Sequence, residues 1–208
     1  MPQNRENDNT VSTKKKILNA SMKLFSELGY KNASVRKIAA EVGIRESALY
    51  NHFKNKEEIF LSVASEIFST PFNKDDSPAL TPAQLSNPKS YLHKFAMEFK
   101  LITFDKTKES LFRILMIELF QNKQLREGFI NEFHNKNIKA LSAVFFTMMQ
   151  EGLVRSSDPL LMANEFLGPL FYLRLHVTLL RIDNESTTNL STQFEKHVDF
   201  FWESVKVV

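Results

Sequence analysis

The sequence of 208 residues contains no cysteine and only five glycines. Without cysteine, neither a disulfide framework nor a thiolate metal site can form. Five glycines leave little material for a phosphate-cradling loop, and the chain shows neither a metal-spaced His/Glu set nor a serine nucleophile elbow. These absences argue against an enzyme, and we expect no cofactor and no bound metal.

Long apolar runs are also missing. None approaches the ~20 residues that a membrane-spanning helix requires. The N-terminal stretch MPQNRENDNT is polar and lacks the apolar core of a signal peptide. At the same time, 43% hydrophobic residues, including 19 Phe, provide enough apolar material for a packed core and exclude a disordered chain. We therefore expect a cytoplasmic protein with no membrane partner.

Positive charge is unevenly distributed along the chain. Residues 1–60 hold 11 Lys and Arg against 7 Asp and Glu, whereas residues 61–208 hold 16 against 17. The whole positive excess therefore lies in the first 60 residues. This distribution suits a segment that meets nucleic-acid phosphates, although a solvated basic surface would look the same.

The most informative stretch is SVRKIAAEVGIRESALYNHF, from Ser34 to Phe53. Ser34 is a good N-cap, and Ile38, Ala39 and Val42 follow at the spacing of a buried helical stripe. Gly43 ends this short helix, since glycine adopts the left-handed conformation at low cost. The pattern predicts a helix of about two turns followed by a tight turn.

A second short helix begins at Arg45. Ala48, Leu49 and Phe53 share its inward side, while the opposite side is polar and comprises Glu46, Ser47, Tyr50 and Asn51. Two such helices joined by a glycine turn predict a helix-turn-helix, whose second helix enters the DNA major groove. An ordinary helical hairpin inside a larger domain would show the same inward stripes.

The run from Ser34 to Ile59, and ALYNHFKNKEEIF above all, resembles the DNA-binding domain of TetR/AcrR-type transcriptional regulators. The resemblance covers about residues 14–62. It implies an all-α fold with a three-helix DNA-binding head followed by a helical effector-binding and dimerisation domain. It further implies phosphate contacts by Ser34, Tyr50, His52 and Lys56, and base-facing positions for Arg36, Arg45, Glu46 and Ser47. Without the motif, Tyr50 and His52 would be read as packing residues.

Two residues depart from the family pattern. Arg45 stands where a capping Ser or Thr is usual, and Ser47 stands where Gly is common. Because an arginine side chain cannot cap a helix N-terminus, the recognition helix is expected to begin differently by a residue. Ser47 leaves less room than glycine for close approach of the backbone to DNA.

Flanking elements complete the N-terminal domain, which we place at residues 13–60 after a disordered tail at residues 1–12. A helix is expected to follow Thr13 and to end at Gly29, with Lys14, Lys15 and Lys16 in its first turn. Cations are unfavourable there unless an anion such as a phosphate lies nearby, or the run is simply solvated. Asn55 and Glu58 predict a capping box at the start of the next helix.

Residues 61–208 are expected to form the effector-binding and dimerisation domain. The proline-rich stretch 70–88 predicts a loop with one short turn. Beyond it the pattern is helical throughout. We predict five helices here: Tyr91–Phe104, Thr107–Gln121, Gln124–Glu151, Pro159–Ile182 and Leu190–Val205.

The last two of these helices carry more apolar surface than one neighbour would cover, which favours a homodimer over a monomer with two core helices. The family resemblance implies a small-molecule effector, and the aromatic composition favours an apolar or aromatic one. Each candidate pocket residue could equally be plain core. The candidates are Phe99, Phe112, Met116, Phe145, Met149, Phe171 and His176, with Arg113, Arg174 and Glu118 as polar anchors.

The sequence therefore predicts a ligand-responsive regulator: a repressor that binds a pseudo-palindromic operator in double-stranded DNA as a dimer and is released by its effector. The alternative is an interaction protein that has kept the helix pair but acts through a protein partner. Salt-sensitive binding to duplex DNA would separate the two.

Overall fold

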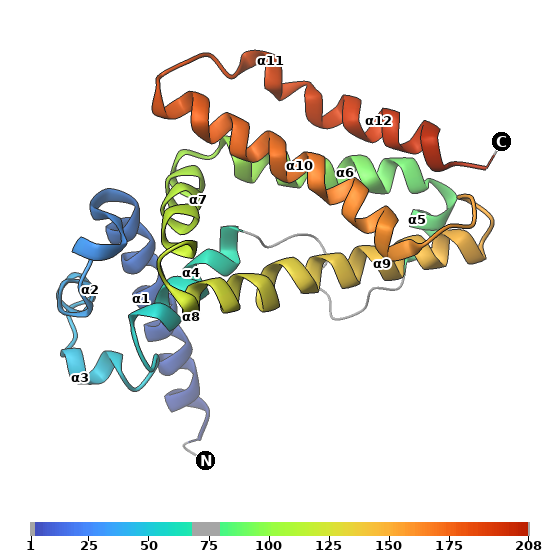
Figure 1. Cartoon of the computed structure of the whole chain (residues 1–208). Coiled ribbons are helices and arrows are strands. Elements are labelled where there is room, and N and C mark those ends of the chain that lie inside the picture. Colours follow the sequence, from blue (N-terminus) through green and yellow to red (C-terminus); the bar gives the residue numbers. More distant parts are fainter. Residues whose placement is uncertain (1–2, 68–79, 208) are drawn as a thin grey trace. The chain divides into compact units, whose positions relative to one another are not determined.

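The computed structural model describes residues 3–67 and 80–207 (Figure 1). Within these ranges the chain is helical, with one isolated bridge between Val154 and Lys206 and no strand. The all-α prediction is confirmed. The helices are α1 (Gln3–Asn32), α2 (Val35–Val42), α3 (Glu46–Leu49), α4 (Lys56–Ile67), α5 (Pro82–Ser86), α6 (Pro88–Phe104), α7 (Lys106–Leu119), α8 (Lys123–Gly128), α9 (Asn135–Gln150), α10 (Pro159–Ile182), α11 (Thr188–Ser191) and α12 (Gln193–Val205).

The helices form two compact units. The head unit contains α1 to α4 together with α7 and α8, and the body unit contains α5, α6 and α9 to α12. Helix α1 packs against α2, α4 and α7 in the head unit. Helices α7 and α8, which the sequence assigns to the region after residue 60, thus pack with the N-terminal helices.

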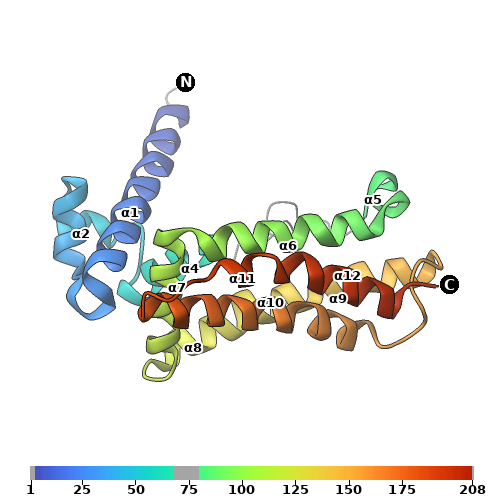
Figure 2. The same ribbon diagram turned by 90° about the horizontal axis from the view of Figure 1, so that it is seen from above.

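The body unit is built from four long helices, α6, α9, α10 and α12, which run alongside one another (Figures 1 and 2). Phe166 of α10 lies at the centre of their core. Its ring centroid is 5.6 Å from that of Phe95, 6.0 Å from Phe145 and 5.1 Å from Phe201. Each of these rings is essentially excluded from solvent, so the hydrophobic effect holds the four helices together.

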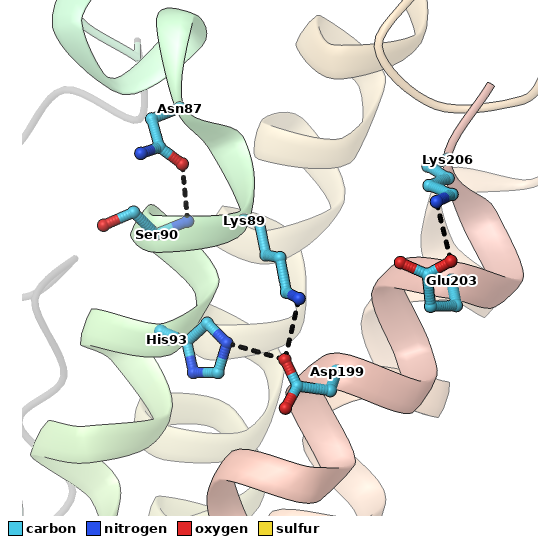
Figure 3. Close-up of polar contacts among 7 residues, drawn as sticks. All are labelled: Asn87, Lys89, Ser90, His93, Asp199, Glu203 and Lys206. Atoms are coloured by element: carbon cyan, nitrogen blue, oxygen red, sulfur yellow. Dashed lines mark hydrogen bonds and ion pairs between the residues drawn. The ribbon is translucent and has the colours of Figure 1, made fainter. Parts of the chain in front are cut away.

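Ion pairs add polar links between α6 and α12. The Nζ of Lys89 and the Nε2 of His93 lie 2.8 and 3.1 Å from the same carboxylate oxygen of Asp199 (Figure 3). Farther along the two helices, the Nζ of Lys100 lies 2.7 Å from Glu195. These polar contacts, together with the apolar packing, therefore fix how α12 is aligned along α6.

Helix α10 matches its predicted bounds. Asp158 accepts hydrogen bonds from the amides of Leu160 and Leu161, and Pro159 occupies the first turn, where its missing N–H costs nothing. The short turn expected somewhere in residues 70–88 is helix α5, whose start carries a capping box between Thr81 and Gln84. The rest of the predicted loop, residues 70–79, lies outside the described residues.

The prediction of one helix over Gln124–Glu151 was wrong. A π-helical turn, Phe129–His134, separates α8 from α9. A Cβ at Gly128, the last residue of α8, would lie 2.6 Å from a methyl carbon of Leu61. Glycine at this position therefore allows α8 to approach the Leu61 side chain of α4 without displacing it. The last predicted helix is likewise divided, into α11 and α12.

Helix α1 begins at Gln3, ten residues before Thr13, after which it was predicted to start, and inside the segment expected to be a disordered tail. Residues 3–12 contain neither proline nor glycine, so nothing in the backbone stops the helix from extending there. Lys14, Lys15 and Lys16 consequently lie several turns inside α1. The expectation that they occupy its first turn was wrong. The other end agrees with prediction, since Gly29 has φ 77° and marks a kink.

Candidate DNA-binding surface

Helix α2 is held at both ends by the residues that the sequence indicated. The Oγ of Ser34 accepts a hydrogen bond of 3.2 Å from the amide of Lys37. Ile38 and Ala39 are buried in the head unit, while Val42 is half-buried. The N-cap therefore satisfies one of the orphan amides at the helix start, and burial of the inward stripe fixes the orientation of α2.

The turn after α2 is a Schellman motif. Gly43 has φ 76° and ψ 30°, its amide bonds to the carbonyl of Ala40, and the amide of Ile44 bonds to the carbonyl of Ala39. A Cβ at Gly43 would meet nothing within 4 Å. The requirement for glycine therefore comes from the left-handed backbone and not from crowding.

Helix α3 is a short turn of Glu46–Leu49 whose hydrogen bonding continues beyond it. Arg45 occupies the N-cap position in an extended conformation and makes no side-chain capping bond, as expected of arginine. The amides of His52 and Phe53 both bond to the carbonyl of Leu49, at 2.9 and 3.2 Å. Leu49 and Phe53 are buried and anchor this segment to the head unit.

The four predicted base-facing residues form one exposed polar set. Arg36 lies on α2, and Arg45, Glu46 and Ser47 lie at the start of α3; all four side chains are exposed. Within the described residues, the guanidinium groups and the Glu46 carboxylate make no hydrogen bond or ion pair. Arginine can contact O6 and N7 of guanine together, and Glu can accept from N4 of cytosine. This surface is therefore chemically able to read base edges.

The four predicted phosphate-facing residues have mixed environments. Ser34 is exposed, and its O–H can still donate although its oxygen serves as the helix cap. Tyr50 is 49% exposed, so it is not a fully buried packing residue. His52 is half-buried. Three of the four positions thus present a donor at or near the surface, as phosphate contacts require.

Lys56 is the exception. Its Nζ donates a hydrogen bond of 2.9 Å to the backbone carbonyl of Tyr30 and lies 4.2 Å from the centre of the Tyr30 ring. The ammonium therefore caps the end of α1, where the helix dipole favours a cation. Burial, together with the nearby carboxylates of Glu57 and Glu118, raises the pKa of the Tyr30 phenol well above its ordinary value.

The start of α4 differs in detail from the predicted capping box. The Oδ1 of Asn55 accepts from the amide of Glu58 at 2.8 Å, as expected. In return, the Glu58 carboxylate accepts from the amide of Lys54, at 2.6 Å, and not from the amide of Asn55. The side chain of Glu58 is long enough to reach one residue farther back. Each of the two side chains therefore still accepts from one backbone amide near the helix start, as in a capping box.

Lys14 lies beside the recognition element, by which we mean α3 and the residues that follow it up to Phe53. The motif alone did not identify this neighbour. Its Nζ lies 5.3 Å from the centre of the ring of Phe53, which lies in the turn that follows α3. Helical spacing could have indicated it, because Lys14 is three residues before the fully buried Ile17 and so continues the inward stripe of α1. On another side of α1, Lys23 pairs with Glu41 of α2 at 2.8 Å. The hydrogen bond and charge of Glu41 raise the pKa of Lys23.

The candidate pocket residues divide between the two units. Phe99 and Phe145 are buried in the body unit, where Met149, Phe171 and His176 are half-buried. Arg174 is 1% exposed, and its guanidinium carbon lies 5.7 Å from the centre of the Phe99 ring. The candidates on α7 belong to the head unit: Phe112 and Glu118 are buried, and Met116 and Arg113 are half-buried.

Among the described residues, His, Asp and Glu side chains form no group of three or more that could hold a metal ion. No helix in the described ranges is long and apolar enough to cross a membrane.

Comparison with protein families gives two matches on this chain. Residues 17–63 match the model of bacterial regulatory proteins of the tetR family, and residues 90–202 match the C-terminal domain of AefR-like transcriptional repressors. The first match contains α2, the glycine turn and α3. The second spans more than half of the chain and contains most of the body unit.

Individual proteins agree with these matches. The uncharacterised HTH-type transcriptional regulator YhgD of Bacillus subtilis is 26% identical over 177 residues, which are 82% of this chain and 84% of that protein. A putative TetR-family regulator from Mesorhizobium loti shares the fold with a TM-score of 0.73 at 20% identity, covering 95% of this chain and 98% of that one. SmeT of Stenotrophomonas maltophilia, in its triclosan complex, gives a TM-score of 0.69 at 16% identity, covering 94% and 92%.

Proteins of this family regulate transcription and are not enzymes, in agreement with the chemistry of the surface described above. The helix-turn-helix with its left-handed glycine, the exposed polar face of α3 and the two family matches lead to one conclusion: the chain belongs to the TetR family and is a DNA-binding transcriptional regulator.

Proposed function

We propose that this regulator is a repressor that binds a pseudo-palindromic operator as a homodimer and leaves the DNA when a small apolar or aromatic effector binds. The observation that carries the proposal is the exposed polar face of α3, presented by a buried Leu49–Phe53 anchor and the Gly43 turn. The match to the C-terminal domain of AefR-like repressors supports repression. Residues 13–60 would bind DNA, and residues 61–208 would bind the effector and dimerise.

On the operator, Arg36, Arg45, Glu46 and Ser47 would face bases, and Ser34, Tyr50, His52 and Lys56 would contact phosphates. The exposure of the first set and the donor chemistry of the second support this division. Lys56 could use only the donors that its bond to the Tyr30 carbonyl leaves, so its share of the phosphate contacts should be the smallest of the four.

Dimerisation is supported by apolar surface on α10 and α12. Leu161, Tyr172, Leu179 and Ile182 are each about half or more exposed and recur on one side of α10. On α12, Phe200 is 76% exposed. Large exposed apolar surfaces on single chains mark association sites. A two-fold dimer would also set two recognition elements one DNA turn apart, ~34 Å.

An effector site in the aromatic interior of the body unit is supported by Phe99, Phe145 and Phe171, with Met149 and His176 beside them on the same helices. Phe112 and Met116 of α7 remain candidates. Release would require the effector to prefer the arrangement of the dimer that does not bind DNA. The triclosan complex of SmeT supports the general class of a small-molecule effector.

Selection from a pool of random DNA duplexes tests the proposal. We expect a pseudo-palindrome to be enriched, Tyr50→Phe and Arg45→Ala to weaken binding, and affinity to fall steeply with salt. A screen of apolar and aromatic compounds for release of that duplex would then identify the effector. If no sequence is enriched and salt has little effect, the operator reading is wrong and a protein partner becomes the better hypothesis.

A further inference from the structure

The structure points to a second DNA-contacting element in the head unit, which rests on the proposed operator binding. We propose that Lys14, Lys15 and Lys16 of α1 bind the phosphate backbone of the same duplex beside the recognition element. They would contribute affinity without sequence preference. The three residues stand outside the helix-turn-helix and outside the contacts that the motif implies.

The first observation is position. The Nζ of Lys14 lies 5.3 Å from the centre of the Phe53 ring, and Phe53 closes the segment that carries Tyr50 and His52. Lys14 continues the inward stripe of Ile17, but it lies beyond the end of the core and remains exposed. The lysine run thus begins next to the end of the recognition element.

The second observation is direction. Successive residues of an α-helix are rotated by about 100°, so three consecutive side chains spread over more than half of its circumference. Lys14 projects toward Phe53, whereas Lys16 lines a groove of about 370 Å³ between α1 and α2 together with Asn19 and Glu41. A phosphate chain passing along this end of the head unit would meet a lysine on either side of α1.

The third observation is charge. All three side chains are exposed, and none of them forms an ion pair with a carboxylate of the described residues. The one carboxylate in the groove, Glu41, is already paired with Lys23 at 2.8 Å. Between residues 13 and 32, α1 carries a single acid, Glu27. Three adjacent cations without acids repel one another, and a polyanion relieves that repulsion.

The three lysines do not lie at an end of α1, where the helix dipole would act on their charges. The lysines lie several turns from the start of α1, so the helix dipole neither opposes nor explains them. Their chemistry suits phosphates and not bases, because an ammonium on a flexible stem is a point charge without the bidentate geometry of arginine.

The test is the salt dependence of binding to the selected operator and to an unrelated duplex. The triple variant Lys14→Gln, Lys15→Gln and Lys16→Gln keeps residues of similar helix propensity. We expect it to bind both duplexes more weakly by the same factor. The slope of log affinity against log salt should decrease by about 0.9 for each lysine that contacts a phosphate.

The control removes the same charge elsewhere. Lys94, Lys136 and Lys139 are exposed on α6 and α9 of the body unit, and a triple Gln variant there should leave the slope unchanged. An unchanged slope in the α1 variant, or an equal decrease in the control, overturns the proposal. If the unmodified protein binds no duplex, the operator proposal itself fails. If the triple variant of α1 still selects the operator and its slope of log affinity against log salt is unchanged, only the proposed lysine contact is overturned.

Discussion

The ammonium of Lys56 contacts both the backbone carbonyl and the ring of Tyr30, 2.9 Å from the oxygen and 4.2 Å from the ring centre. This contact joins the first residue of α4 to the last turn of α1, across 26 residues of sequence. Tyr30 in turn packs on Phe60 of α4, with ring centroids 4.9 Å apart. The lysine that the motif assigns to DNA is thus also a structural link within the head unit.

We predict that Lys56→Gln destabilises the protein by about 1–3 kcal/mol. The substitution removes a hydrogen bond from a charged donor and a cation–π contact, both partly shielded from solvent. Urea unfolding would measure the change. Lys54→Gln, which removes an exposed ammonium two residues away, is the matched control and should cost little. Equal stability of the Lys56 variant and its control would show that the contact with Tyr30 contributes nothing.

Gly43→Ala should destabilise the head unit by about 1–2 kcal/mol, because an L-residue with a Cβ is strained at φ 76°. The open space around the position leaves no steric cost to add. Gly43→Asn should cost less, since asparagine visits the left-handed region more readily. Thermal unfolding of the two variants measures the difference. If alanine is as stable as glycine, the left-handed turn does not persist in solution.

Residues whose role is local could be predicted well. Gly43 was identified from its place after an amphipathic stripe, and the start of α10 followed from Asp158 and Pro159. The inward and outward sides of α3 were assigned correctly because buried Leu49 and Phe53 recur at helical spacing.

Features that depend on distant parts of the chain could not be predicted. Gly128 approaches Leu61 just before the break between α8 and α9, and a single glycine in a helical pattern reveals neither that neighbour nor the break. The partner of Lys56 is a backbone carbonyl far away in sequence, so no spacing rule points to it. The start of α1 was missed because residues 3–12 contain no strong signal either for or against a helix.

Acid should weaken the α6–α12 contact through Asp199. Hydrogen bonds from Lys89 and His93 lower the pKa of this carboxyl (Figure 3). A group with a depressed folded-state pKa stabilises the fold above its unfolded pKa, near 3.8, and the stabilisation is lost as pH falls through the folded value. Asp199→Asn should therefore have a lower Tm than the unmodified protein at pH 6, and the difference should shrink below about pH 4.

The control for this experiment is Glu203→Gln. Glu203 pairs with Lys206 on the same stretch of chain, at 2.6 Å, and joins no second helix (Figure 3). We expect it to change the Tm less than Asp199→Asn at pH 6. A Tm difference for Asp199→Asn that stays constant from pH 6 to pH 3 would mean that ionisation of Asp199 does not contribute to stability.

The exposed aromatic rings of α10 and α12 provide the test of the dimer. We predict that Tyr172→Asp and Phe200→Asp each raise the dimer dissociation constant by about 30-fold or more, because a charge would replace a large apolar side chain at a buried anchor of the interface. Sedimentation measures the dissociation constant, and helical content shows that each chain still folds. Since both rings are more than 60% exposed in the single chain, neither change opens its core.

The matched control is Phe120→Asp. Phe120, the residue after α7, is 87% exposed and belongs to the head unit, so the same substitution there should leave the dimer intact. Monomeric Tyr172 or Phe200 variants should bind a full operator far more weakly while keeping affinity for a half-site, since each head unit is unchanged. If Phe120→Asp produces the monomer and the other two variants remain dimeric, the interface lies on the head unit and the proposed pairing through α10 and α12 is wrong.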